Sequence, residues 1–121
     1  MEINCVEISI HDDDLGCQIL FSDKSTGREK AKSPESYLLI QRAYPDGDFD
    51  SDYIYFETHT ENYAGELTEY EMELSKRDFI LNLSEADKIQ VSINPTDKQY
   101  LRLKETLSFL TIKTGKLIIA D

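Results

Sequence analysis

The sequence predicts an α+β fold: an antiparallel β-sheet of about six to eight strands with one main C-terminal helix packed on it. Apolar residues alternate with polar ones along most of the chain up to Ile93, which is the period of a strand with one buried face. After Thr96 the apolar spacing changes to three and four residues, the period of an amphipathic helix. A length of 121 residues matches one ordinary domain, so we expect a single domain over residues 1–121.

The first hairpin is expected from residues 2–10 and 15–22, joined by a polar turn. Apolar residues alternate through 2–10 with a slip of phase at Cys5, which a β-bulge there would reconcile. In the register that matches the apolar positions, Ile8 lies opposite Cys17, and Cys5 falls roughly 10 Å further along at the usual rise per residue. A disulfide needs a Cα separation below roughly 7 Å, so we expect both cysteines to be buried thiols.

Three further strands are expected in the middle of the chain. Residues 37–43 are apolar at both alternating positions in their first half, which is typical of a central strand covered on both faces. Residues 53–56 are the expected partner, across a long hairpin loop that holds four aspartates. Residues 67–74 alternate cleanly, and their outer, solvated face is expected to carry Glu69, Glu71 and Glu73.

A second hairpin is expected from residues 79–83 and 89–93. Their apolar residues alternate in phase on either side of a polar turn, and the matching register sets Phe79 opposite Ile93. Each of these strands has one apolar face, so the hairpin is expected to bury that face against the core.

The main helix is expected to begin after Thr96, because Gln99 three residues later completes the spacing of a capping box. The apolar residues that follow are spaced three, four and three apart, which predicts a buried stripe made of Tyr100, Leu103, Leu107 and Leu110. Gly115 is expected to end the helix, which leaves residues 117–119 for a last short strand.

The charge of the chain is strongly negative and unevenly distributed. The formal net charge is −11, and residues 33–73 hold eleven acidic residues and one base, Arg42, for a local net charge of −10. Such a field disfavours a nucleic-acid or anionic-membrane partner and speeds the capture of a cationic one by roughly 10- to 1,000-fold. No window approaches the roughly 18 apolar residues of a membrane span, and the N-terminus lacks the basic and apolar start of a secretory signal. We therefore expect a cytoplasmic protein that binds a basic partner.

The aspartate-rich loop has three interpretations. Counted from Asp46, acidic residues occupy positions one, three, five, seven and twelve of a calcium loop, the last being Glu57. Position six, however, is Ser51 where such a loop requires glycine, and the flanks are expected to be strands instead of helices. The loop is therefore a solvated hairpin tip, an anionic surface for a partner, or a metal site in residues 46–57.

Catalytic chemistry finds little support in the sequence. His11 at a turn and His59 at a strand end have no second ligand at metal-binding spacing. No serine or cysteine lies in a nucleophile-elbow context, and no glycine-rich phosphate loop opens a helix. We therefore expect neither an enzyme nor a cofactor site. Tyr44 and Tyr63, near the acidic third, are candidates for interface contacts, because tyrosine offers a large contact area with few rotatable bonds.

Several segments in the middle of the chain carry a family resemblance. They are Tyr-Leu-Leu-Ile-Gln-Arg at 37–42, the acidic loop, Tyr-Ile-Tyr-Phe-Glu at 53–57, Tyr-Ala-Gly at 63–65 and Leu-Ser-Lys-Arg-Asp-Phe-Ile-Leu-Asn-Leu at 74–83. With these motifs the chain resembles the immunity protein 10 family of bacterial polymorphic toxin systems over roughly residues 36–112. It departs from the family pattern at Ala64, where glycine is expected.

The resemblance implies a function and no catalytic residues. Members of that family are small antidotes encoded beside a toxin, which implies that this chain binds and neutralises the effector domain of its toxin. The positions that fit the family pattern are Gln41, Arg42, Glu57, Tyr63 and Gly65. We expect Arg42 to form an internal ion pair with Glu57 across the hairpin instead of contacting a partner.

The leading hypothesis is therefore a toxin-neutralising immunity protein whose acidic surface covers a basic groove of the effector domain. Its candidate contact residues are Asp46, Asp48, Asp50, Asp52, Tyr44, Tyr63, Glu69 and Glu71. The alternatives are a calcium-binding module that uses residues 46–57 and an acidic inhibitor that mimics nucleic acid. The sequence also leaves a homodimer open.

Overall fold

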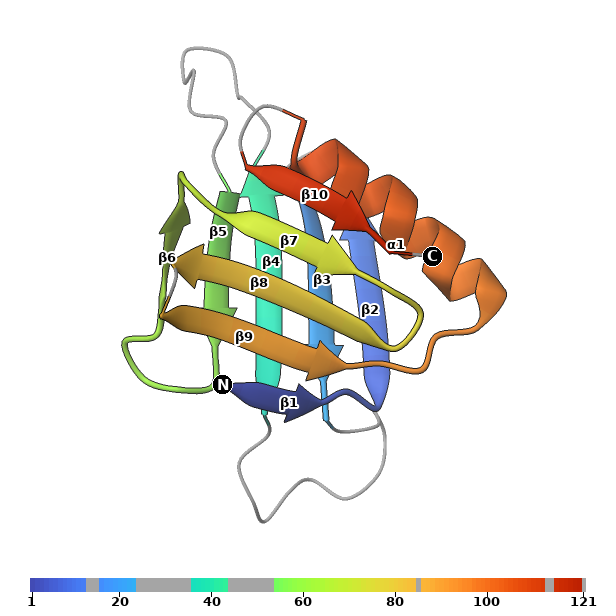
Figure 1. Ribbon diagram of the computed structural model, residues 1–121, viewed down its shortest axis with the longest axis horizontal. Helices are drawn as coiled ribbons and strands as arrows, with labels where there is room; N and C mark the ends of the chain where they lie inside the picture. Colours follow the sequence, from blue (N-terminus) through green and yellow to red (C-terminus); the bar gives the residue numbers. More distant parts are fainter. Residues whose placement is uncertain (13–15, 24–35, 44–53, 85, 113–114, 121) are drawn as a thin grey trace.

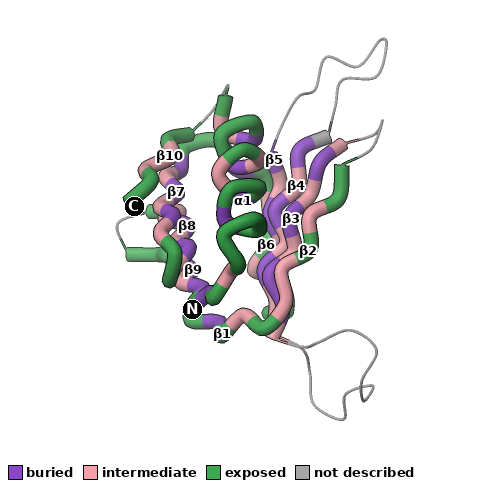
Figure 2. Tube along the Cα trace, turned by 90° about the vertical axis from the view of Figure 1, so that its right-hand side faces the viewer, coloured by how far each residue is buried: buried purple, intermediate pink, exposed green. Residues whose placement is uncertain are grey.

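Two β-sheets of five strands each face one another, and the helix α1 lies between them along one side (Figure 1, Figure 2). The structure is a computed structural model and describes residues 1–12, 16–23, 36–43, 54–84, 86–112 and 115–120. The α+β class predicted from the sequence is confirmed, and most strand pairs are antiparallel. The ten strands, however, exceed the six to eight expected and are divided between two sheets.

The first sheet combines the second hairpin with strands from both ends of the chain. Its order is β1-β9-β8-β7-β10. Its strands are β1 Glu2–Asn4, β7 Glu71–Leu74, β8 Asp78–Ser84, β9 Asp87–Ser92 and β10 Lys116–Ile119. The short last strand predicted at 117–119 is thus confirmed as β10. The outer strands β1 and β10 join β9 and β7 in parallel, which the sequence did not indicate.

The second sheet follows sequence order and is antiparallel throughout. Its strands are β2 Glu7–Asp12, β3 Gly16–Ser22, β4 Tyr37–Ala43, β5 Ile54–Thr58 and β6 Ala64–Leu67. The predicted central strand is confirmed as β4, between β3 and β5. The prediction that this strand is covered on both faces was wrong. Leu38 and Ile40 are fully buried, whereas Leu39 and Gln41 on the outer face are partly exposed.

The chain passes between the sheets at two places where the sequence suggested a continuous strand. Residues 2–10 form β1 in the first sheet and β2 in the second, so the slip of phase marks a crossing instead of a bulge. The N–H of Cys5 donates to the carbonyl oxygen of Ser92 at 2.9 Å, in the first sheet. The N–H of Val6 donates to Ser22 at 2.7 Å, in the second. A second crossing, at residues 68–70 between β6 and β7, interrupts the strand expected at 67–74. Strand β6 was not predicted, since Leu67 is its only residue inside that range.

Both predicted hairpins form, but in registers that differ from those expected. In the first, Cys17 lies opposite Asp12 instead of Ile8, because β2 continues beyond the expected turn. In the second, the partner of Phe79 is Val91, two residues from the one expected. Both shifts are by an even number of residues, so the apolar side chains keep the face that was predicted for them.

Apolar side chains fill the space between the sheets. Phe21 of β3 stacks on Phe79 of β8, with ring centroids 5.0 Å apart and ring planes 18° apart, so the sheets are in direct contact there. The helix α1, Asp97–Leu110, adds its predicted stripe to this core, and the buried residues are Tyr100, Leu103, Leu107 and Leu110. The described part of the chain holds no helix of the length and apolarity that a membrane crossing requires.

The two ends of α1 differ in how well they were predicted. The capping box is confirmed: the N–H of Gln99 donates to Thr96 Oγ1 at 3.1 Å, and the N–H of Thr96 donates to Gln99 Oε1 at 2.9 Å. The C-terminal end was wrong, because the helix ends at Leu110 with Thr111 as its cap. Gly115 lies further on, just before β10, with a left-handed φ of 75°.

Candidate functional site

The fold brings acidic stretches that are far apart in the sequence to one end of the second sheet. Because every strand pair of this sheet is antiparallel, β2, β4 and β6 end where β3 and β5 begin (Figure 1). Asp12 ends β2 and Leu67 ends β6 at this end, and residues 68–70 lead from there to β7 of the first sheet. In the sequence, residues 13–15 follow β2 and residues 44–53 follow β4, and both segments lie outside the described residues. We call this region the acidic end and define it by Asp12, Glu66, Glu69 and Glu71.

The segments that connect strands at the acidic end contain most of the residues singled out from the sequence. Asp46, Asp48, Asp50, Asp52 and Tyr44 lie outside the described residues, as do Asp13 and Asp14. With the four residues that define the acidic end, these stretches hold ten of the 24 acidic residues of the chain. The remaining described glutamates of residues 33–73 lie elsewhere: Glu57 on the outer face of the second sheet, Glu61 in the β5–β6 turn and Glu73 on the outer face of the first sheet.

An open hollow of about 660 Å³ borders the acidic end. It is lined by Glu69, Tyr70, Glu71, Asn82, Leu83, Ser84, Ala86 and Lys88. Glu69 and Glu71, two of the predicted contact residues, are therefore brought together in one concave surface. The apolar part of the lining suits the stem of a long side chain, and the two carboxylates suit a cationic head group.

The carboxylates of the hollow are set among polar and basic neighbours. Glu71 pairs across the sheet with Asn82 on one side and with Lys116 on the other. The Nδ2 of Asn82 donates to Glu73 at 3.0 Å, which leaves the carbonyl oxygen of its amide as a further acceptor. Lys88 contributes the one basic side chain of the lining, so the lining carries a net negative charge.

Tyr63 links the β5–β6 turn to Asp87 at the start of β9, between Ala86 and Lys88 of the hollow. Its hydroxyl donates to Asp87 Oδ1 at 2.5 Å, and its ring meets Phe56 edge-on with centroids 5.7 Å apart. Thr58 Oγ1 donates to the carbonyl oxygen of Tyr63 at 2.9 Å, which fixes the backbone of the turn. Partial burial and the hydrogen bond to Asp87 raise the pKa of Tyr63, because the neutral phenol is the form that donates.

The change Tyr63→Phe is expected to lower the free energy of unfolding by about 1 kcal/mol at neutral pH, because it removes a hydrogen bond to a charged acceptor. A raised folded-state pKa contributes stability below the ordinary tyrosine pKa of about 10, and this contribution is lost as the pH rises through the folded value. Urea unfolding followed by circular dichroism should therefore show the stability difference between the unaltered protein and the Tyr63→Phe variant shrinking above about pH 10. A difference that stays constant from pH 7 to pH 11 would contradict this role.

The expected ion pair between Arg42 and Glu57 does not form. Arg42 points inward and is 6% exposed; its NH1 donates to the carbonyl oxygen of Phe109 at 2.6 Å, and its guanidinium lies 4.5 Å from the centroid of the Phe109 ring. Glu57 lies on the outer face, opposite Leu39, and accepts a 2.6 Å hydrogen bond from the Tyr37 hydroxyl. The two side chains are thus on opposite faces of the second sheet, and Arg42 stabilises the C-terminal turn of α1.

The residues of the family pattern do not form one site. Gln41 and Glu57 lie on the outer face of the second sheet, Arg42 lies inside, and Tyr63 lies at its turn. A Cβ at Gly65 would meet no heavy atom within 4 Å. Among the described residues the positive φ of a non-glycine is at Asn62, with a value of 68°, and Ala64 has no such conformation. Neither position 64 nor position 65 therefore needs glycine for backbone geometry.

The cysteines and His59 offer no reactive group. Both thiols are free, but only Cys17 is buried as expected, whereas Cys5 is partly exposed. Desolvation raises the pKa of both thiols, which disfavours the nucleophilic thiolate. The Nδ1 of His59 accepts the N–H of Tyr37 at 3.1 Å. Among the residues that the structure describes, no group of three or more histidine, cysteine or carboxylate side chains could hold a metal ion.

The sequence did not indicate Asn82, Asp87 and Lys88 as part of a site. Their contribution depends on the β8–β9 register and on the connection between the sheets, which strand alternation does not encode. Comparison of the chain with protein-family models, with curated proteins and with solved structures gives no match.

Proposed function

We propose that the protein is a toxin-neutralising immunity protein: it binds the basic effector domain of a cognate bacterial toxin through the acidic end and blocks that domain. The observation that carries the proposal is the hollow beside the acidic end, where Glu69 and Glu71 line one concave surface of net negative charge. A binding role without catalysis also agrees with the burial of Cys17 and with the hydrogen bond that Arg42 makes inside the fold.

The physical basis of the proposal is electrostatic complementarity. Carboxylates gathered at one end create a directional negative field, which accelerates encounter with a positively charged groove and disfavours partners of like charge. The hollow that contains Glu69 and Glu71 offers a place for a lysine or arginine side chain of the effector, with its stem against Leu83 and Ala86. Resemblance to the immunity protein 10 family supports the same function, and a cytoplasmic location would let the protein meet the toxin inside the cell.

Salt and charge reversal provide the test. The partner is the effector domain encoded by the neighbouring toxin gene, purified in a catalytically inactive form, and the rate constants are measured by surface plasmon resonance. We expect nanomolar affinity, and an association rate that falls by at least about tenfold between 50 and 500 mM NaCl. The double variant Glu69→Lys/Glu71→Lys and the variant Asp48→Lys/Asp50→Lys should each slow association by about tenfold or more at low salt.

A control variant separates local from global charge. Glu2→Lys/Glu105→Lys changes the net charge by the same amount at exposed positions away from the acidic end, in β1 and α1. It should leave association within about twofold of the unaltered protein, because charges beyond the Debye length of about 8 Å are largely screened at physiological salt. Equal slowing by all three double variants, or no binding to the effector domain, would refute the proposal.

A further inference from the structure

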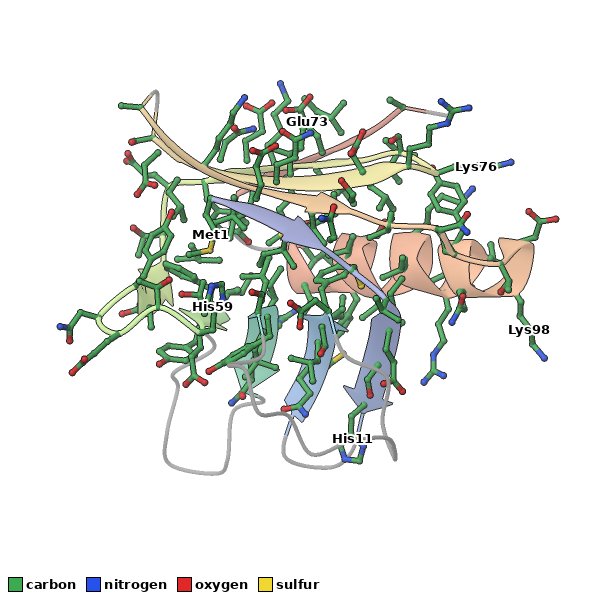
Figure 3. All side chains as sticks on the ribbon, turned by 90° about the horizontal axis from the view of Figure 1, so that it is seen from below. Met1, His11, His59, Glu73, Lys76 and Lys98 are labelled. Atoms are coloured by element: carbon green, nitrogen blue, oxygen red, sulfur yellow. The ribbon has the colours of Figure 1, made fainter. Side chains whose placement is uncertain are left out.

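A second charged region, of opposite sign, lies at the other end of strand β7. Glu71 opens β7, whereas Lys76 and Arg77 follow its last residue. Lys98 and Lys104 of α1 add two more bases, and Figure 3 shows Lys76 and Lys98 projecting at the same end of the helix. With the neighbouring acids Asp78 and Asp97, this region carries a local net charge of +2 in a chain whose net charge is −11.

The basic region contains a hollow of about 400 Å³ lined by Lys76, Asp97, Tyr100, Leu101 and Lys104. Both lysines lie close to the ring of Tyr100: Lys104 Nζ is 4.9 Å and Lys76 Nζ is 5.9 Å from the ring centroid. Tyr100 itself is only 4% exposed, so it forms a fixed base for the hollow. Leu101 is 55% exposed, which is a large apolar exposure beside two ammonium groups.

We propose that this lysine-flanked hollow binds an acidic peptide segment of a protein partner, one in which an apolar side chain lies between two carboxylates. The apolar side chain would cover Leu101, and the carboxylates would pair with Lys76 and Lys104. The exposed leucine gains from the removal of its apolar surface from water, which a purely ionic ligand would not provide. The site is separate from the acidic end, and the proposal does not depend on the immunity function.

The chemistry of the lining favours a peptide over a nucleic acid. Single-stranded nucleic acids are bound by exposed aromatic rings that stack on bases, and the aromatic ring of this lining, Tyr100, is buried. Asp97 on the rim would oppose a continuous row of phosphates, whereas separated carboxylates can avoid it. The carboxylates of the acidic end are roughly 10 Å or more away, the length of β7, so salt screens their repulsion of an acidic peptide.

The test uses fluorescence anisotropy with the full chain and a labelled synthetic peptide that contains Asp-Ser-Leu-Ser-Asp, because alternate residues of an extended peptide face the same side. The expected dissociation constant is in the micromolar range at 50 mM NaCl, and about fivefold to tenfold weaker at 300 mM. Lys76→Glu and Lys104→Glu should each weaken binding by about fivefold or more, because each turns an attraction into a repulsion. Leu101→Ser should weaken it by a similar factor without a change of charge, and the exposure of Leu101 leaves the fold intact.

A control variant and a neutral peptide test whether binding depends on the lysines of the hollow and on the carboxylates of the peptide. Lys88→Glu makes the same charge change in β9, opposite Asn82 and away from the basic region, and should leave peptide binding within about twofold. A peptide with Asn-Ser-Leu-Ser-Asn should bind at least about tenfold more weakly than the acidic one. The proposal is overturned by any of three results: no binding at 1 mM peptide, equal effects of Lys88→Glu and Lys76→Glu, or tighter binding of a single-stranded oligonucleotide than of the peptide.

Discussion

Replacement of Arg42 by alanine is expected to lower the free energy of unfolding by about 3 kcal/mol and the melting temperature by roughly 10 °C. The guanidinium makes a charge-assisted hydrogen bond to the carbonyl oxygen of Phe109 and stacks on the ring of the same residue. These interactions contribute about 1.5–3 and about 1–2 kcal/mol in comparable partly buried settings. The last turn of α1 has no basic residue of its own, so Arg42 is the cation that faces the negative end of the helix dipole.

A methionine at the same position separates the charge from the volume. Arg42→Met keeps a long apolar stem and removes the desolvation cost of a buried cation, so its loss should be smaller, about 1 kcal/mol. Thermal and urea unfolding by circular dichroism measure both variants. If Arg42 acts only through the fold, the folded Arg42→Met protein should bind the effector domain with an unchanged rate. Stability equal to that of the unaltered protein in both variants would show that the contact with Phe109 contributes nothing.

The position of Arg42 also shows what strand alternation can and cannot predict. Arg42 has the parity of Leu38 and Ile40, so the alternation already placed it on the inner face, and Glu57 has the parity opposite to Phe56. The predicted ion pair was wrong because the prediction used only the charges of the two residues. It did not use the strand alternation, which places them on opposite faces of the sheet. The partner that replaced Glu57 is a helix carbonyl from Phe109, which no local pattern can reveal.

Local periodicity predicted most of the elements but missed β6, and it did not predict the division of the strands between two sheets. The inner faces of the two predicted hairpins were predicted correctly because alternation depends only on which side chains are apolar, and an even shift of register preserves it. The crossings at Cys5 and between β6 and β7 were predicted as a bulge and as a continuous strand, because the alternation of apolar residues does not show a change of sheet. The backbone bends at Val6 and at Thr68 and Glu69. The parallel pairing of β1 and β10 joins residues far apart in the sequence and has no local signal at all.

The candidate site was also predicted only in its local features, and the positions of its residues relative to one another depend on the long-range strand order. Charge counting found the acidic stretch, and alternation placed Glu71 and Glu73 on an outer face. The fold separates these residues further: Glu71 lines the hollow with Glu69, while Glu73 accepts a hydrogen bond from Asn82. Asp12 and Glu66 lie at the same end of the second sheet only because its strands are antiparallel in order, and they lie on its opposite edges, β2 and β6. Long-range strand order, which the sequence does not display, therefore decides which carboxylates can act together.

Gly115→Ala is expected to lower the free energy of unfolding by about 3 kcal/mol, because two independent costs act at this position. The left-handed φ of 75° costs a residue with a Cβ about 1–2 kcal/mol. A Cβ would also overlap ring carbons of Tyr70, which is 7% exposed and part of the core. Overpacking of this kind typically costs about 1–3 kcal/mol. The N–H of Lys116 donates to the carbonyl oxygen of Tyr70 at 3.2 Å, so displacement of Tyr70 would also loosen the start of β10.

Two further variants distinguish these costs. Gly65→Ala is the matched control: its Cβ meets no heavy atom within 4 Å and its φ is not left-handed, so the change should alter stability by less than about 0.5 kcal/mol. Gly115→Asn isolates the steric cost, because asparagine tolerates the left-handed region better than alanine but brings the same Cβ. If overlap with Tyr70 dominates, asparagine should be nearly as destabilising as alanine in urea unfolding. Recovery of most of the stability by asparagine would instead assign the cost to backbone conformation, and a neutral Gly115→Ala would exclude both.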